Sequence, residues 1–385
     1  MPTNVYRLFR SALLLTTVGL AAANAAETPA TAAPKQLSAV EAMPVSGGSS
    51  VLHTSAAASA LMDVTSGRLL SQENGDRELR IASLTKIMTA IVAIENDRLD
   101  DVVTVSVRAA GKEGSSLYLK AGEKIKLEDL LYGLMLRSGN DAATAIAEHV
   151  GGSLEGFVYL MNRKADELGM KHSRFGNPSG LDQDGHYSSA NDLARLTSYA
   201  LRNETFRTIV GTKVKTAPNP NENWDYKWAN KNKMLFQYDG ADGVKTGYTK
   251  KALRCLVSSA TRNGQQLVAV TLNDRDDWLD HRRLLDHGFA KYPLQTIVRK
   301  GEAVAGYPYV AVNDFRYPLA EGEREKLRLR IQPIASDTID YVFGARGKLS
   351  VRLEERPIAT VGLIAERQPA NEPEKRRTFA ERIKK

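Results

Sequence analysis

Cysteine is almost absent from this sequence, since Cys255 is the only one among 385 residues. A single thiol excludes an internal disulfide framework and any zinc or iron–sulfur site built from several cysteines. The six histidines form no H-E-x-x-H pair or similar spacing, which argues against a zinc peptidase. Charged residues make up 25% of the chain, and this fraction excludes a polytopic membrane protein and a wholly disordered one.

The length and the charge set broad limits. At roughly 100–200 residues per domain, 385 residues predict two or three domains with enough chain to bury a core. The formal net charge of +8 hints at an anionic partner without identifying it.

The N-terminal segment lacks acidic residues. It carries Arg7 and Arg10, an apolar run from Ala12 to Ala23, and the A-x-A sequence that ends at Ala25. The run is too short to span a bilayer, so we predict a signal peptide over residues 1–25, with an uncleaved anchor as the alternative. We therefore expect an exported protein, periplasmic or otherwise extracytoplasmic, with a flexible Ala/Pro/Ser/Thr/Gly-rich linker over residues 26–57.

Hydrophobic periodicity predicts the elements that follow. Residues 59–70 are typical of a β-hairpin, and Leu84–Ile94 is apolar around most of its circumference, which indicates a buried helix. Short β-like runs are expected over 102–126. Further elements are predicted as helices at 127–136, 141–150, 154–168, 189–201 and 277–289, and as strands at 253–260 and 266–272.

The pattern changes after Tyr292-Pro293, where short alternating runs such as Lys326–Ile331 and Lys348–Leu353 indicate β structure only. We predict a mixed α/β (α+β) domain over residues 58–291, a small all-β domain over 292–368 and a basic tail over 369–385.

Ser83-Leu84-Thr85-Lys86 is the only S-x-x-K in the chain. Residues at i and i+3 share a helix face, so the Ser83 hydroxyl and the Lys86 amine can touch where the buried helix begins. Free backbone N–H groups at a helix N-terminus suit a developing oxyanion. The alternative is a helix lysine that reaches solvent.

Two more motifs follow in order. Ser138-Gly139-Asn140 lies between two predicted helices, with Asn140 as the expected N-cap, and Lys245-Thr246-Gly247 is expected on or beside an edge strand. Each alone is compatible with a turn, but their joint appearance after S-x-x-K is specific.

This combination resembles the penicillin-binding proteins and serine β-lactamases. The segments at 115–123, 180–190 and 242–249 are more similar still to the low-molecular-mass penicillin-binding proteins that are serine D-alanyl-D-alanine carboxypeptidases. The resemblance covers roughly residues 58–290, and it implies a penicillin-binding-protein-like catalytic domain followed by a small β domain. It implies no cofactor and no metal.

Four catalytic residues are implied by the resemblance. Ser83 would be the nucleophile and Lys86 the general base, while Ser138 would relay a proton to the leaving D-alanine. Asn140 would orient the peptide and the lysine. Burial and the nearby Lys245 would both lower the pKa of Lys86, which a general base requires.

The substrate-binding residues are implied in the same way. Lys245 and Thr246 would bind the terminal carboxylate, and Gly247 would let the substrate approach the strand. The backbone N–H groups of Ser83 and Tyr248 would form the oxyanion hole. Whether Arg275 or Arg254 also contacts the carboxylate stays open.

The implied partners are peptidoglycan stem peptides ending in D-Ala-D-Ala and β-lactams as covalent inhibitors, with no nucleic acid. A serine β-lactamase is the nearest alternative, although class A enzymes carry S-D-N where this chain has Ser138-Gly139-Asn140, and no E-x-x-L-N segment is found. An exported basic module that binds anionic wall or membrane polymers is the second alternative.

The tail carries a small apolar face of Phe379, Ala380 and Ile383 among basic residues. This pattern predicts at most a weak, salt-sensitive contact with a membrane surface.

Overall fold

The structure is a computed structural model that describes residues 52–366. The predicted signal peptide, most of the predicted linker and the basic tail lie outside the described residues. Among residues 52–366, no helix has both the length and the apolar character needed to cross a membrane.

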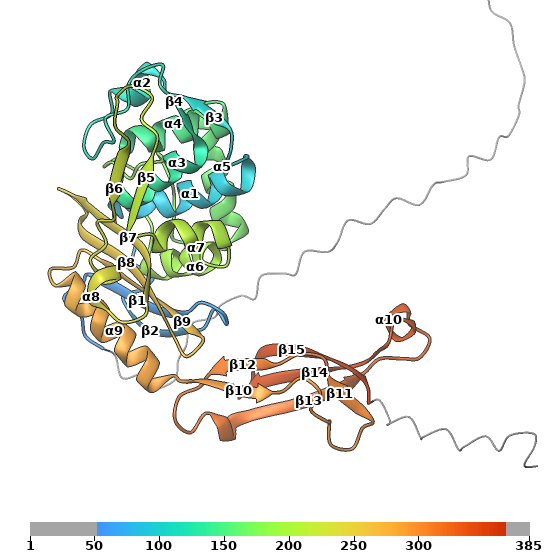
Figure 1. Ribbon diagram of the computed structural model, residues 1–385. Helices are drawn as coiled ribbons and strands as arrows, with labels where there is room; N and C mark the ends of the chain where they lie inside the picture. Colours follow the sequence, from blue (N-terminus) through green and yellow to red (C-terminus); the bar gives the residue numbers. More distant parts are fainter. Residues whose placement is uncertain (1–51, 367–385) are drawn as a thin grey trace, which may run out of the picture. The chain divides into compact units, whose positions relative to one another are not determined.

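A five-stranded antiparallel sheet forms the centre of the first region (Figure 1). Its strands, in spatial order, are β2 (Leu69–Glu73), β1 (Ala58–Asp63), β9 (Gln265–Leu272), β8 (Leu253–Arg262) and β7 (Ala241–Thr249). The predicted hairpin and the two predicted strands are confirmed, and β7, which carries Lys245-Thr246-Gly247, is an edge strand as expected.

Both faces of this sheet are covered, because successive side chains of a strand point to opposite sides. Along β1, Ala60 and Met62 pack into the core that contains the helices α1 and α6, whereas Leu61 packs with Leu284 and Leu285 of α9. All six residues of β1 are buried, which explains why its sequence is apolar nearly throughout rather than alternating.

The helices lie between the strands along the chain. Their bounds are α1 (Thr85–Asn96), α2 (Val107–Ala110), α3 (Leu127–Tyr132), α4 (Asn140–Gly151), α5 (Leu154–Glu167), α6 (Ala190–Ala200), α7 (Glu204–Gly211), α8 (Met234–Gln237) and α9 (Asp277–Lys291). Every residue of α1 from Thr85 to Ala93 is buried, which confirms the predicted buried helix. Ser189 accepts a hydrogen bond from the Asp192 N–H and thus caps α6 as predicted.

Three segments differ from the sequence prediction, and for the third, residues 202–240, no helix or strand was predicted. The 102–126 segment holds the hairpin of β3 (Val102–Thr104) and β4 (Lys124–Lys126), but also the short helix α2, whose first turn is capped by the Ser106 side chain. The predicted helix at 127–136 ends as α3, and a π-helical turn at Gly133–Arg137 follows it. A second small hairpin pairs β5 (Val214–Ala217) with β6 (Tyr226–Ala229).

The chain after α9 is almost entirely β structure, and its strands pair only with one another. It comprises β10 (Leu294–Val298), β11 (Tyr309–Ala311), β12 (Phe315–Pro318), β13 (Leu327–Pro333), the short helix α10 (Ile339–Val342), β14 (Ala345–Leu353) and β15 (Arg356–Ala365). A four-stranded sheet has the order β11-β15-β14-β13 and covers a small apolar cluster. The predicted fold class is confirmed, while the exact domain boundaries stay a prediction.

Candidate active site

Ser83 lies in a 3₁₀ turn, Ala82–Leu84, directly before α1. Ala82 has a φ of 47°, a left-handed conformation that is costly for a residue with a Cβ. Its carbonyl accepts a hydrogen bond from Thr85 Oγ1 at 2.8 Å, which holds the turn from the helix side. Gly180 approaches from the other side, because a Cβ there would lie 1.9 Å from the Ala82 oxygen. The turn that presents Ser83 is therefore fixed on two sides.

Lys86 lies one turn after Ser83 and is completely buried. Its Nζ is 3.1 Å from Ser83 Oγ, 2.7 Å from Asn140 Oδ1 and 2.6 Å from the carbonyl oxygen of Ser179. A neutral amine has two hydrogens and one lone pair. Since the amide and carbonyl oxygens can only accept, they take both hydrogens and leave the lone pair for the Ser83 hydroxyl. This geometry suits a general base acting on Ser83.

The pKa of Lys86 is lowered well below its usual value, chiefly by burial and then by the charges of Lys245 and Lys231. The buried Asp141 opposes this shift only as the smallest contribution. The expectation that burial and Lys245 lower the pKa of Lys86 is confirmed. The complete burial of Lys86 rules out the alternative of a lysine that reaches solvent.

Asn140 corrects one prediction. It was expected to be the N-cap of α4, but Gly139 holds that position and Asn140 is the first helical residue. Its side chain is used elsewhere: Oδ1 contacts Lys86, and Nδ2 donates to the Glu113 carbonyl at 2.7 Å. The amide is thereby fixed in one orientation, which the sequence pattern of a helix cap does not anticipate.

Ser138 ends the π-helical turn in a left-handed conformation, with φ 67° and ψ 34°. It is only 5% exposed. Strand β7 contacts both this turn and the turn that holds Ser83, so the three sequence motifs converge in space. The role of Ser138 in proton relay stays a prediction.

Lys245 lies on β7 and is 2% exposed. Its Nζ donates to the carbonyl of Thr246 at 2.9 Å, which is a neutral partner. Burial, followed by the charge of Lys231, lowers the pKa of Lys245 to about 7. A cation held here without a carboxylate is poised to bind one.

Gly247 is the point of closest approach between β7 and the Ser83 turn. A Cβ at this position would lie 3.2 Å from the Ala82 Cβ and 3.3 Å from the backbone nitrogen of Ser83. A side chain at this position would press on the turn that holds Ser83, which favours glycine here. Tyr248 follows at the exposed end of the strand, and its backbone role in the oxyanion hole, like that of Ser83, stays a prediction.

The two arginines left open by the sequence are placed differently. Arg254 is paired with Asp277, with Nε 3.1 Å from Oδ2. Arg275 is exposed in the segment between β9 and α9.

Three contributors were missed in the sequence. The carbonyl of Ser179 contacts Lys86 directly, yet a backbone oxygen leaves no residue-type signal. Lys231 donates to Ser115 Oγ at 3.3 Å and lies in an unremarkable Asn-Lys-Asn run. His186 is buried, its Nε2 lies 2.8 Å from Thr85 Oγ1, and burial lowers its pKa to about 4, so it supports the Ser83 turn as a neutral ring.

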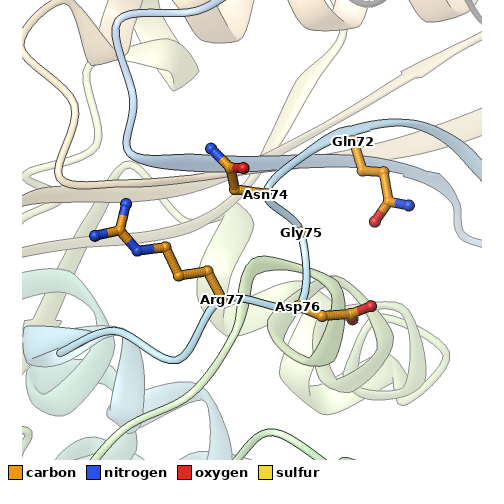
Figure 2. A pocket seen from close by; sticks show the side chains of 5 residues that line it. All are labelled: Gln72, Asn74, Gly75, Asp76 and Arg77. Carbon is orange, nitrogen blue, oxygen red and sulfur yellow. The ribbon is translucent and has the colours of Figure 1, made fainter.

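Another hollow lies at the end of β2, lined by Gln72 and by residues 74–77 (Figure 2). The side chains of Gln72 and Asp76 extend to one side of the loop, and those of Asn74 and Arg77 to the other. Asn191 Nδ2 bridges Gln72 and Asp76 at 2.5 and 2.9 Å. These polar groups therefore brace the loop against α6 and are not aimed at a common centre.

One cluster among the described residues has metal-ligand spacing. The ligand atoms of Asp97, Asp101 and His149 lie within 4.8 Å of one another. His149 Nε2 is 3.2 Å from Asp97, and Arg98 Nε is 3.9 Å from Asp101. It shares no residue with the site around Ser83.

Sequence comparison finds a family model and several relatives that match this chain. A family model described as D-alanyl-D-alanine carboxypeptidase matches residues 46–276. The D-alanyl-D-alanine carboxypeptidase DacF of Bacillus subtilis is 36% identical over 255 residues, which cover 64% of this chain and 65% of DacF. The D-alanyl-D-alanine carboxypeptidase of Streptomyces sp. strain K15 is 34% identical over 308 residues, which cover 74% of this chain and 99% of that protein. The match thus spans a little under two thirds of DacF.

Solved structures are similar over a longer part of the chain. Penicillin binding protein 5 from Haemophilus influenzae has a TM-score of 0.67 and 28% identity, with 82% of this chain and 97% of that chain covered. DacD from Francisella tularensis has a TM-score of 0.65 and 26% identity, with 85% and 96% covered. Both matches extend beyond residues 46–276 and include β strands that follow α9.

Proposed function

Because this chain belongs to the family of D-alanyl-D-alanine carboxypeptidases, we propose that it is a serine hydrolase that removes the terminal D-alanine from peptidoglycan stem peptides. The observation that carries the proposal is the 3.1 Å approach of Ser83 Oγ to a fully buried Lys86 whose two hydrogens have other acceptors. An activated serine beside a buried cationic anchor is what acyl transfer at a C-terminal peptide bond requires.

In the acylation step, Lys86 Nζ accepts the proton of Ser83 as Oγ attacks the carbonyl of the penultimate D-alanine. An ester bond to Oγ forms, and the peptide C–N bond breaks. The leaving D-alanine nitrogen gains a proton, for which Ser138 is the proposed relay. The backbone N–H groups of Ser83 and Tyr248 are the proposed donors to the oxyanion.

Substrate selection follows from charge. Lys245 and Thr246 bind the terminal carboxylate, which restricts cleavage to the last residue of a peptide. A water molecule then attacks the ester, adds its hydroxyl to the acyl carbon and returns the proton to Ser83. The products are D-alanine and a stem peptide shortened by one residue. That peptide has lost the terminal D-alanine bond that drives cross-linking.

β-Lactams are proposed as covalent inhibitors, because they present a strained amide and a carboxylate to the same two groups. Because the sequence predicts an export signal, we propose that the reaction takes place outside the cytoplasm, where peptidoglycan lies. A weak membrane contact of the tail is retained only as a hypothesis.

The test is acylation by a labelled penicillin together with D-alanine release from a peptide ending in D-Ala-D-Ala. Ser83→Ala should abolish both signals. The matched control Ser198→Ala, which removes a buried hydroxyl on α6, should leave both unchanged. Labelling that persists in Ser83→Ala would refute the assignment, and rapid turnover of nitrocefin without D-alanine release would favour the β-lactamase alternative.

A further inference from the structure

A groove of about 440 Å³ lies between the 117–120 segment and the β5–β6 hairpin, and we call it the aromatic groove. Its hairpin wall is formed by residues 219–228. Tyr118 and Trp224, one from each wall, are 85% and 67% exposed. Two large aromatic side chains exposed around one hollow are unusual on a protein surface and indicate a binding site.

The groove has fixed walls. Lys120 Nζ lies 3.0 Å from Glu222 Oε1, so an ion pair joins the two sides. Tyr226 stacks on Trp228 with ring centroids 5.2 Å apart, and the Tyr226 hydroxyl donates to Glu123 Oε1 at 2.8 Å. Trp228 is only 4% exposed, so the inner rings form a packed base while the outer rings stay available.

The 117–120 wall of the groove is connected to the active site along the chain and by hydrogen bonds. Asn140, which orients Lys86, donates its backbone N–H to the Ser115 carbonyl at 2.7 Å. The following residues are held by the same helix start, since Leu117 N–H donates to Asp141 and Tyr118 N–H to Ser116 Oγ. The chain from Ser115 to Lys120 spans at most about 17 Å when extended. The groove therefore lies within one short, anchored segment of the catalytic amide.

We propose that the aromatic groove binds the N-acetylated amino sugar to which the stem peptide is attached, an inference that rests on the proposed function. The apolar C–H face of a pyranose ring can stack on exposed Tyr118 and Trp224, whose rings are large and stiff. The amides of Asn219 and Asn221 on the hairpin wall supply neutral donors and acceptors for hydroxyl and acetamido groups.

Length and charge agree with this occupant. Four extended residues separate the sugar from the reactive carbonyl, so the stem peptide can place the sugar up to about 13 Å from that carbonyl. Lys120 and Glu222 neutralise one another, and the other charged residues of the lining, Asp225 and Lys227, are again one acid and one base. The lining therefore has no net charge and favours a neutral polar ligand over a charged peptide side chain.

The experiment compares two substrates for the full chain: a free pentapeptide ending in D-Ala-D-Ala, and the same pentapeptide on its disaccharide. We expect wild type to prefer the disaccharide-linked substrate in kcat/KM. Trp224→Ala and Tyr118→Ala should each lower that preference about fivefold and leave the free pentapeptide unchanged. Tyr159→Ala removes an aromatic ring that is 65% exposed on α5 and should change neither.

A wild type without preference, or equal losses on both substrates, would overturn the proposal, because the groove would then contact only the peptide or nothing. A separate arm titrates the peptide-free disaccharide against Ser83→Ala and follows tryptophan fluorescence. Saturable quenching that is lost in Trp224→Ala supports the sugar site, even if neither peptide releases D-alanine. A lack of D-alanine release would count against the proposed function alone. The absence of quenching would count against the sugar site.

Discussion

The two regions of the molecule bury different kinds of side chain. Among residues 52–366, every buried charged or histidine side chain lies at or before His281, and Lys86 and Lys245 are the buried lysines. The β region after α9 buries an apolar cluster instead, with Val351 and Leu363 at its centre. Burying an ionisable group costs free energy, so the first region accepts a cost that the second avoids. The two buried lysines, Lys86 and Lys245, are the part of this cost that lies at the candidate active site.

The strongest test of this contrast removes the buried base. Lys86→Met should lower the rate of acylation by a labelled penicillin by about 10²–10⁴-fold, because general base catalysis is lost. Lys164→Met is the matched control, since Lys164 pairs with Glu95 and Glu167 on a helix surface and has a raised pKa. A Lys86→Met rate within tenfold of wild type would contradict the assigned role.

In the β region after α9, removal of a buried side chain should lower stability and leave activity unchanged. Leu363→Ala removes a side chain that is 1% exposed, and it should lower the free energy of unfolding of this region by about 2–5 kcal/mol. Urea unfolding followed by hydrogen exchange of strands β14 and β15 measures the loss. Release of D-alanine under native conditions should be unchanged.

Leu329→Ala gives the matched comparison, because Leu329 is 56% exposed on β13. Its effect on unfolding should stay within about 0.5 kcal/mol. If Leu363→Ala abolished acylation without unfolding the β strands, the two regions would not be separable in function.

The sequence predicted the elements best where periodicity was strong. The buried helix around Ile87, the β1–β2 hairpin and the strands after residue 292 all followed from apolar spacing. The helix α2 and the π-helical turn at Gly133–Arg137 were missed, because a four-residue helix and a change in helix pitch leave no periodic signal.

The candidate active site also contains residues that the sequence predicted and groups that it did not. The i, i+3 spacing predicted the contact of Ser83 with Lys86, and the family resemblance implied that Asn140 orients the lysine; the structure brings all three together. The Ser179 carbonyl and the left-handed Ala82 could not be found, since both depend on backbone geometry set by distant packing. Asn140 was misread as a cap because the same residue type serves both purposes.

The pH dependence of the Michaelis constant tests the role of Lys245 as the cation that binds the substrate carboxylate. With a pKa of about 7, Lys245 is charged below neutral pH and loses its proton as the pH rises. The Michaelis constant for a D-Ala-D-Ala peptide should therefore rise by up to about tenfold per unit above pH 7, until the pKa of the complex is reached. Lys245→Arg keeps its charge and should flatten this dependence.

The same shift predicts a stability trend of known sign. The unfolded chain, in which the lysine pKa is near 10.5, binds more protons than the folded chain between about pH 7 and 10. The contribution of Lys245 to stability should rise with pH across that window, and Lys245→Met should remove this pH dependence.

For the kinetic prediction, a Michaelis constant that stays flat from pH 6 to 9 in wild type would show that Lys245 does not supply the charge that binds the substrate carboxylate.

The smallest effect is expected for an exposed cation beside the same strand. The guanidinium of Arg254 is already occupied by Asp277, and its side chain is 47% exposed, so it offers little free charge to a substrate carboxylate. Arg254→Ala should change the Michaelis constant for a D-Ala-D-Ala peptide less than about threefold, whereas Lys245→Ala should raise it at least about tenfold. Steady-state kinetics of the two variants at pH 6.5, where Lys245 is charged, make the comparison direct. Equal effects would mean that burial does not select the carboxylate-binding cation, because the exposed and the buried charge would then serve the substrate alike.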